Sequence, residues 1–250
     1  MAMEEQKKSK VSAVVLAAGR GRRMNSDIPK QFLPLSGKPV LYYSLKAFED
    51  SRVERLVIVT SKEEIPYVEK EIVQKYDFRK VCAVVEGGRE RYFSVLNGLK
   101  ALYAAQDVET LQDSYVLIHD GARPFVSGEI IERCIEGAAR YGACVAGMPV
   151  KDTIKLASED GFAVSTPKRS LVWMVQTPQA FSSPLIYDAY CELEKKEETL
   201  AKQGISVTDD ASVVELFTEK RVKLVEGSYE NIKITTPEDL EIAETFLNSV

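Results

Sequence analysis

A short apolar run followed by a glycine-broken, arginine-rich loop is the feature that most constrains this chain. The stretch from Val11 to Leu33 reads VSAVVLAAGRGRRMNSDIPKQFL. Its apolar beginning is typical of a parallel strand that is covered on both faces. The alanines and glycines that follow leave room for a ligand close to the backbone, where successive N–H groups can face one anion. We therefore predict a strand that ends in a phosphate-binding loop. The candidate contacts in this loop are Ala17, Ala18, Gly19 and Gly21.

The same loop is rich in positive charge. Its cationic residues are Arg20, Arg22, Arg23 and Lys30. The glycine spacing lacks the third glycine of a dinucleotide-binding fingerprint and the GK[ST] ending of a P-loop, which argues against both of those classes. Taken alone, it fits an ordinary strand-to-loop turn with solvated arginines equally well. Pro29 favours the phosphate site, because a proline at the end of the loop restricts the backbone and holds Lys30 where the chain returns to the fold.

Composition excludes several classes of protein. The chain has 250 residues, of which 45% are hydrophobic, so one α/β domain with a sizeable core is the default expectation. We assign residues 1–10 to a disordered tail and residues 11–250 to this domain. A formal net charge of -5 argues against a general nucleic-acid-binding protein.

No apolar run is long enough to cross a membrane, and the polar start has no signal-peptide core. The four cysteines contain no CxxC pair, so we expect buried free thiols in a cytoplasmic protein, not a disulfide framework or a zinc site.

Strand patterns alternate with helix patterns along the chain, which predicts βαβ units and a mainly parallel sheet. The predicted strands are 55–60, 81–85, 115–119, 143–150, 222–226 and 231–235, in addition to the one that begins at Val11, and the stretch 171–181 is expected only to return the chain to the main body. The predicted helices are 41–48, 61–75, about 94–105, 129–141, 184–195, 209–216 and 237–247. The fold class is therefore α/β, with a seven-stranded or similar mixed, mainly parallel sheet flanked by helices.

Two further strand ends carry candidate site residues. Gly88 and Ser94 follow the 81–85 strand, and carboxyl ends of strands are where open α/β sheets bind ligands. A short strand-to-helix loop with Ser94 at the helix start is an equally good interpretation. Asp120 follows the 115–119 strand, where its carboxylate suits a magnesium ion or ribose hydroxyls, although it could also cap the next turn. His119 is the only histidine in the chain, and we interpret it as a packed, hydrogen-bonded residue, since nothing marks a nucleophile beside it.

Together these segments resemble a known family. LAAGRGRRM followed by PKQFLPLSGKPVL is similar to the opening signature of the nucleotidylyltransferases that activate sugar and polyol phosphates. Within them the chain most resembles the 2-C-methyl-D-erythritol 4-phosphate cytidylyltransferase family of the non-mevalonate isoprenoid pathway. The segments EGGRERYFSV, HDGARPF, PVKDTIK, WMVQTPQAF, VTDDAS and NIKITTPEDL extend the resemblance in the same order.

The resemblance implies a Rossmann-like nucleotidyltransferase fold and transfer of a cytidylyl group from CTP to a polyol phosphate, with release of pyrophosphate. It implies that Gly88 and Ser94 contact the cytosine and ribose. It implies that the polyol phosphate substrate is bound by Asp120, Arg123, Thr153, Arg169 and Thr208.

The segment from about 151 to 170 does not follow the alternation of strands and helices that the rest of the chain shows. Its residues alternate between apolar and polar on both sides of a Glu159-Asp160-Gly161 turn, which predicts a hairpin. We expect this hairpin to project as a β-arm, although an edge hairpin lying over the sheet remains an alternative. In the family that the chain resembles, the arm joins two subunits and carries residues into the partner's active site. The resemblance therefore implies a homodimer in which Thr153 and Arg169 act in the opposite subunit.

Nucleotidyl transfer determines which residues we expect to be catalytic. An ionised phosphate attacks the α-phosphorus of CTP, so the protein needs no strong base, but it must hold two anions together and neutralise the charge that spreads in the transition state. Arg23, Lys30 and Lys233 are the candidates, with Mg²⁺ or another divalent cation bridging triphosphate oxygens near Asp120.

Three alternatives stay open at this point. Ribitol-5-phosphate cytidylyltransferase shares the loop but usually reads LAGG where this chain reads Leu16-Ala17-Ala18-Gly19. A glycosyltransferase would usually carry a DxD metal motif, and Asp209-Asp210 lacks that spacing. A nucleotide-binding regulator without catalysis is the non-enzyme alternative, and the joint presence of Arg23, Lys30, Asp120 and Lys233 weighs against it.

Overall fold

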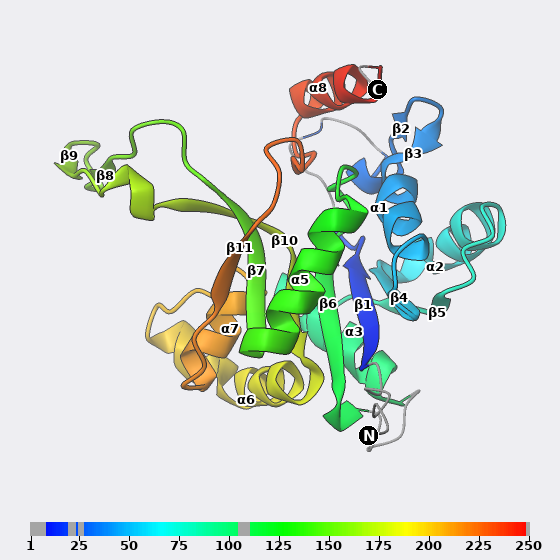
Figure 1. Ribbon diagram of the computed structural model, residues 1–250, viewed down its shortest axis with the longest axis horizontal. Coiled ribbons are helices and arrows are strands. Elements are labelled where there is room, and N and C mark those ends of the chain that lie inside the picture. Colours follow the sequence, from blue (N-terminus) through cyan, green and yellow to red (C-terminus); the bar gives the residue numbers. More distant parts are fainter. Residues whose placement is uncertain (1–8, 20–23, 25–27, 105–110, 249–250) are drawn as a thin grey trace, which may run out of the picture.

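A twisted seven-stranded sheet forms the centre of the computed structural model, which describes residues 9–19, 24, 28–104 and 111–248 (Figure 1). The strand order is β11-β7-β10-β6-β1-β4-β5, and β10 alone runs antiparallel to its neighbours. The predicted mixed, mainly parallel sheet is therefore confirmed. The strands are β1 Lys10–Leu16, β4 Arg55–Thr60, β5 Val81–Glu86, β6 Ser114–Asp120, β7 Ala143–Pro149, β10 Trp173–Ser182 and β11 Lys223–Glu226.

Helices cover both faces of this sheet. They include α1 Val40–Glu49, α3 Arg91–Ala104, α5 Gly128–Tyr141, α6 Ser183–Lys202, α7 Asp210–Phe217 and α8 Pro237–Asn248. Successive strand residues point to opposite faces. In β1, Ala13 and Val15 pack with α1 and α5, whereas Val14 packs with α3 and α6. This two-sided burial explains why the strand reads as an uninterrupted apolar run.

The position of β1 fixes the position of the site. The chain runs from β1 through β4 to the β5 edge and then returns, so that β6 pairs with the other side of β1. In open α/β sheets the crevice at such a reversal, beyond the carboxyl ends of the strands, is where ligands bind. The glycine loop after Leu16 and the Asp120 carboxylate both lie at this point, because Leu16 and Asp120 are paired in register.

The 62–74 segment is helical as predicted, but it is not a continuous α-helix. It consists of a 3₁₀ turn Lys62–Glu64, the single α-turn α2 Ile65–Tyr67 and a π-helical segment Val68–Gln74. Its start is a capping box between Ser61 and Glu64.

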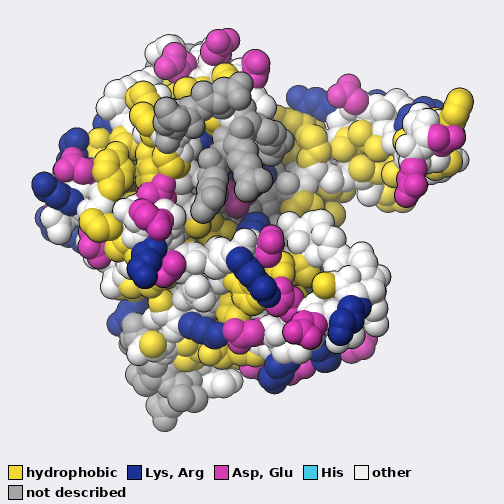
Figure 2. All heavy atoms as spheres, turned by 180° about the vertical axis from the view of Figure 1, so that it is seen from behind, with side chains coloured by type: hydrophobic (Ala, Val, Ile, Leu, Met, Phe, Trp, Pro, Cys, Tyr) yellow, Lys and Arg dark blue, Asp and Glu magenta, His cyan; other side chains and the backbone are white. Residues whose placement is uncertain are grey.

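The predicted β-arm projects from the body between β7 and β10 (Figures 1 and 2). Its paired strands are shorter than the alternation suggested, namely β8 Leu156–Ala157 and β9 Ala163–Ser165. Hydrophobic side chains lie exposed along it, including Phe162 and Val164 with 72% and 65% of their surfaces accessible. The alternative of an edge hairpin lying over the sheet is therefore wrong.

Two expectations from the sequence are incorrect. The segment 231–235 is not a strand, because Ile234 donates its N–H to the carbonyl of Ala122 instead of joining the sheet. All four cysteines are free, but only Cys134 and Cys144 are buried, since Cys82 is exposed on the edge strand β5 and Cys191 is half-buried on α6. Among the described residues, no helix is long and apolar enough to cross a membrane.

Close packing of α3 on the sheet gives a test of the fold. A Cβ at Gly98 would lie 2.5 Å from Val14 Cγ1 and 2.9 Å from Val59 Cγ2. Helix propensity alone would make Gly98→Ala stabilising by about 1 kcal/mol, but overpacking costs about 1–3 kcal/mol. We expect a net loss in the free energy of unfolding, measured by urea denaturation. Gly128→Ala at the start of α5, where nothing lies within 4 Å, is the control and should cause no loss. Equal stabilisation by both substitutions would contradict the packing described here.

Candidate functional site

Two adjacent clefts open at the carboxyl end of the sheet. The larger has a volume of about 690 Å³ and the smaller about 330 Å³. Both are bounded by the same three residues, Arg91, Asp120 and Lys233. A molecule in one cleft and a molecule in the other would therefore meet beside these side chains.

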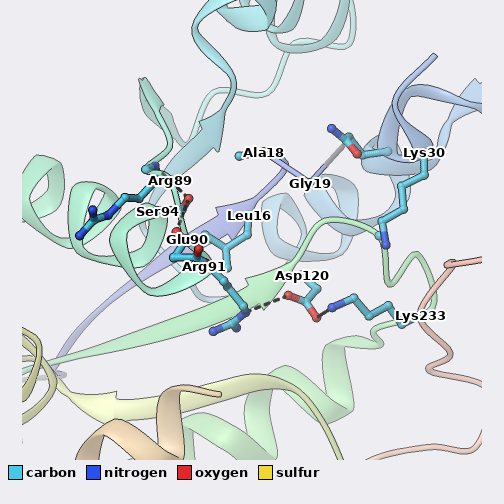
Figure 3. A pocket seen from close by; sticks show the side chains of 13 residues that line it. Leu16, Ala18, Gly19, Lys30, Arg89, Glu90, Arg91, Ser94, Asp120 and Lys233 are labelled. Carbon is cyan, nitrogen blue, oxygen red and sulfur yellow. Dashed lines mark hydrogen bonds and ion pairs between the residues drawn. The ribbon is translucent and has the colours of Figure 1, made fainter. Parts of the chain in front are cut away.

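The larger cleft brings together residues from distant parts of the sequence (Figure 3). Predicted site residues in its wall are Ala18, Gly19, Lys30, Gly88, Ser94, Asp120 and Lys233. Ala17 lies beneath this wall, because its side chain is buried and its N–H donates to Val59 O at 2.7 Å. Gly21 and Arg23 lie outside the described residues. Lys30 Nζ donates to Ile234 O at 2.8 Å, which joins the 30–32 turn to the segment that carries Lys233.

Asp120 is the electrostatic centre of the site. Its Oδ2 lies 2.7 Å from Lys233 Nζ and 3.7 Å from Arg123 Nε, while its Oδ1 lies 3.7 Å from Arg91 Nε. Figure 3 shows Arg91 and Lys233 reaching it from opposite sides. Burial alone would raise the pKa of the Asp120 carboxyl, but Lys233, Arg91 and Arg123 together hold this pKa well below its usual range. The carboxylate is therefore ionised, and the surplus of cations around it is available to anionic ligands.

Arg91 is held by a second carboxylate. Both of its terminal nitrogens donate to Asp210 at 2.8 Å in a bidentate ion pair, and Tyr190 donates its hydroxyl to the same carboxylate at 2.5 Å. Asp210 is fully buried, and its charge raises the pKa of Arg91 even though burial lowers it. The arrangement is rigid, because a bidentate arginine has little freedom left.

The Ser94 hydroxyl is hydrogen-bonded within its own strand-to-helix loop. Ser94 Oγ accepts a hydrogen bond from Gly88 N at 3.0 Å and donates to Glu90 O at 3.3 Å. Its hydroxyl therefore shapes the 87–90 loop. The N–H of Gly88 is likewise already engaged.

The smaller cleft contains three of the predicted acceptor-binding residues, Asp120, Arg123 and Thr208, and also Asp209 and Thr177. Asp209 caps α7 by accepting from Ser212 N at 3.0 Å. Thr153 and Arg169 line neither cleft, since both lie exposed on the arm, where Arg169 donates to Lys151 O at 3.1 Å.

The comparisons with known proteins match the whole of this architecture. The family model of 2-C-methyl-D-erythritol 4-phosphate cytidylyltransferase (IspD) matches residues 11–249. The chain belongs to this family. Curated members from Lachnoclostridium phytofermentans and Lachnospira eligens are 48% and 49% identical to it, over 95% and 94% of this chain and 96% and 98% of theirs.

Solved structures agree with this assignment. The crystal structure of 4-diphosphocytidyl-2C-methyl-D-erythritol synthase from Anaerococcus prevotii superposes with a TM-score of 0.78 at 34% identity, covering 96% of both chains. The 2-C-methyl-D-erythritol 4-phosphate cytidylyltransferase of Thermus thermophilus superposes with a TM-score of 0.72 at 31% identity, covering 96% of this chain and 99% of that one. The family resemblance and the fold predicted from the sequence are thus confirmed.

Sequence reasoning missed Arg91 and Asp210 in this member of the family. The EGGRERYFSV segment drew attention to its glycines and serine, and Asp209-Asp210 was considered only as a pair that lacks the DxD spacing. One signal was present, because a cap needs a single acidic residue and this chain has two in succession. The partners are separated by 119 residues, so no local pattern could pair them.

Metal ligands are few in this site. Among the described residues, no three histidine, cysteine or acidic side chains converge. Of the residues that the structure describes, Asp120 is the one carboxylate that lines both clefts. Magnesium commonly binds one or two carboxylates together with substrate phosphates, so these residues fit an ion that is held largely by a nucleotide and not by the protein alone.

His119 is packed and hydrogen-bonded, as the sequence predicted. Thr177 Oγ1 accepts from Asp120 N at 3.1 Å, so its own proton is directed to His119 Nδ1 at 3.0 Å, and His119 Nε2 then donates to Arg123 O at 3.2 Å. Complete burial lowers the pKa of His119 to about 4. The ring is neutral at pH 7 and has a structural role beside Asp120.

This burial predicts a pH dependence of stability. The unfolded chain takes up the His119 proton near pH 6.5 and the folded chain only near pH 4, so the free energy of unfolding falls as the pH drops through this window. The loss from this residue should be about 2 kcal/mol between pH 7 and pH 5. Because the chain has one histidine, an NMR titration of its ring reports the folded pKa directly. A value near 6.5 would contradict the buried, neutral ring.

Proposed function

We infer that this protein transfers the cytidylyl group of CTP to 2-C-methyl-D-erythritol 4-phosphate, giving 4-CDP-2-C-methyl-D-erythritol and pyrophosphate. One observation carries the inference: two clefts share a cationic junction in a chain that belongs, over almost its whole length, to the corresponding family. The curated relatives bear this name and not that of ribitol-5-phosphate cytidylyltransferase, so the methylerythritol phosphate assignment holds over that alternative.

The arrangement accounts for the reaction by charge and placement. CTP fits the larger cleft, whose wall includes the loops after β1 and β5, and the acceptor phosphate fits the smaller cleft beside Arg123 and Thr208. Lys233 at the junction then faces the α-phosphate and the attacking phosphate together. Its ammonium, with Lys30 and Arg23, would neutralise charge as it spreads over the phosphate oxygens, which is the main requirement of phosphoryl-type transfer.

A divalent cation, Mg²⁺ in the simplest case, would accompany CTP into this site. Asp120 would hold it as the protein ligand, and triphosphate oxygens would complete its shell. When bound, the ion supplies charge neutralisation on the triphosphate. The Lys233 ammonium lies 2.7 Å from the same carboxylate, so Asp120 would be shared between Lys233 and the ion.

We also propose a homodimer that is joined through the arm. A two-stranded hairpin is marginal in water by itself, and this one exposes Leu156, Phe162 and Val164. Pairing with a second copy would bury these side chains. Arg169 and Thr153 would then reach the acceptor phosphate of the opposite subunit, where a guanidinium suits a phosphate well. A cytoplasmic location is expected for such an enzyme, and four free thiols fit a reducing compartment.

Substrate choice is the first test of the function. Purified protein with Mg²⁺ should form pyrophosphate from CTP and 2-C-methyl-D-erythritol 4-phosphate, and much more slowly from ribitol 5-phosphate. ATP and GTP should be poor substrates, because a site shaped for one base leaves buried polar groups unpaired with another. Comparable kcat/KM for CTP and a purine triphosphate, or a preference for ribitol 5-phosphate, would contradict the assignment.

The cationic residues give the second test. Lys30→Ala and Arg23→Ala should each lower kcat by about 100-fold or more, because each removes charge stabilisation that grows in the transition state. Arg23→Lys should restore activity only in part, since an ammonium lacks the guanidinium fork. Lys100→Ala, which removes an exposed lysine paired with Glu194 on the body, is the matched control and should leave kcat unchanged. Near-wild-type turnover in both cleft variants would refute their assignment.

Subunit complementation tests the shared site. Arg169→Ala and Lys30→Ala subunits should each be nearly inactive alone, but a mixed dimer would contain one intact site. Activity should therefore rise toward a quarter of the wild-type value after subunit exchange, as expected for random pairing with one intact site in half of the dimers. An exchanged mixture that stays inactive, or an active monomer in sedimentation, would rule out the shared site.

A further inference from the structure

Lys233 lies on a segment without regular secondary structure. Residues 227–236 connect β11 to α8 and contain neither helix nor strand. Such a segment has no hydrogen-bond ladder to hold it, so its backbone groups need partners elsewhere. The place of the Lys233 ammonium therefore depends on side chains that anchor its neighbours.

Asn231 is the main anchor before Lys233. Its side chain is completely buried, and its Nδ2 donates to Thr177 O at 2.9 Å and to Gln176 Oε1 at 3.2 Å. Its own carbonyl accepts from Arg123 Nη1 at 2.8 Å. One asparagine thus ties the segment both to β10 and to the turn that follows Asp120.

Gln176 completes the anchor from the other side. Its Nε2 donates to Ser228 O at 2.7 Å, while its Oε1 accepts from Asn231 and from Ser228 N at 3.4 Å. Gly227 permits this approach, because a Cβ there would lie 2.3 Å from Gln176 Oε1. The carboxamides of Gln176 and Asn231 therefore hold the segment against β10 at Ser228 and at Asn231, the two ends of its first turn.

A bulge in β10 makes the partners of Asn231 available. Val175 lies opposite Gly147 and Gln179 opposite Val145, so one residue of β7 faces three residues of β10. The extra residues do not take part in the hydrogen bonds between β7 and β10. The Thr177 carbonyl can therefore accept from Asn231. Bulges of this kind are common beside active sites, where they redirect backbone groups.

Thr177 links Asp120 to Asn231. Its hydroxyl accepts from Asp120 N at 3.1 Å, and its carbonyl accepts from Asn231. On the far side of Lys233, Ile234 N donates to Ala122 O at 2.8 Å, two residues beyond Asp120. Asp120 and the backbone that carries Lys233 are thus fixed in one frame of hydrogen bonds.

We propose that Asn231 is a positioning residue of the reaction, which sets the Lys233 ammonium against Asp120 at the junction of the two clefts. This proposal rests on the proposed catalytic role of Lys233. Asn231 itself lines neither cleft, so its effect on catalysis passes through Lys233. If a charged group is displaced slightly from its position in the transition state, kcat falls much more than substrate affinity does. The reason is that the charge stabilises the transition state more than the bound substrate.

A double-mutant cycle tests this proposal. Asn231→Ala should lower kcat by about tenfold or more and change KM for CTP by less than about threefold. In a Lys233→Ala background the same substitution should have almost no further effect on kcat, because the group that it positions is gone. A merely structural asparagine would lower activity by the same factor in both backgrounds.

Two further variants separate positioning from folding. Asn231→Ser keeps a short donor and should retain more activity than Asn231→Ala. Ser114→Ala removes buried hydrogen bonds to Leu111 and Ser183 at the opposite end of β6, so it should lower the melting temperature while leaving kcat unchanged at temperatures where the protein is folded.

The outcomes of the cycle are distinct. Independent, multiplicative effects of the two alanine substitutions, or wild-type turnover of Asn231→Ala, would overturn the positioning role while Lys233 keeps its own. Wild-type turnover of Lys233→Ala would overturn both this proposal and the catalytic role on which it rests.

Discussion

The Asp120 carboxylate, surrounded by Lys233, Arg91 and Arg123, is the interaction on which the rest of the site depends. The three cations would repel one another if this carboxylate were lost. Asp120, together with the Asp210 carboxylate that pairs with Arg91, holds them close, and the cations still outnumber the two carboxylates. A cationic junction of this kind favours the state in which two anions approach each other.

The fold supplies these groups from four separate places. Asp120 ends β6 at the switch point of the sheet, Arg91 begins α3, Arg123 lies in the turn after β6, and Lys233 lies between β11 and α8. Asp210 holds Arg91, whereas Arg123 and the segment that carries Lys233 are both held through Asn231. These hydrogen bonds keep the junction rigid, which reduces the reorganisation required during the reaction.

Local patterns in the sequence predicted most of the fold and several cleft residues. The apolar run of β1 and the alternation of strands and helices are visible locally, because each element buries a characteristic stripe or face. The segment 231–235 was mistaken for a strand because Ile232 and Ile234 alternate with polar residues. Ile234 is buried, but against α8 and its neighbours and not in the sheet. Long-range pairs such as Arg91 with Asp210, and the Gln176 to Asn231 clamp, leave no local signal, since their partners meet only in the folded chain.

The most direct test of this account is a crystal structure of the protein with a non-hydrolysable CTP analogue, Mg²⁺ and 2-C-methyl-D-erythritol 4-phosphate. The account predicts the nucleotide in the larger cleft, the acceptor phosphate beside Arg123 and Thr208, and the α-phosphate at the junction in contact with Lys233. A nucleotide bound with its α-phosphate away from Lys233 and Asp120, or an acceptor bound outside the smaller cleft, would contradict it.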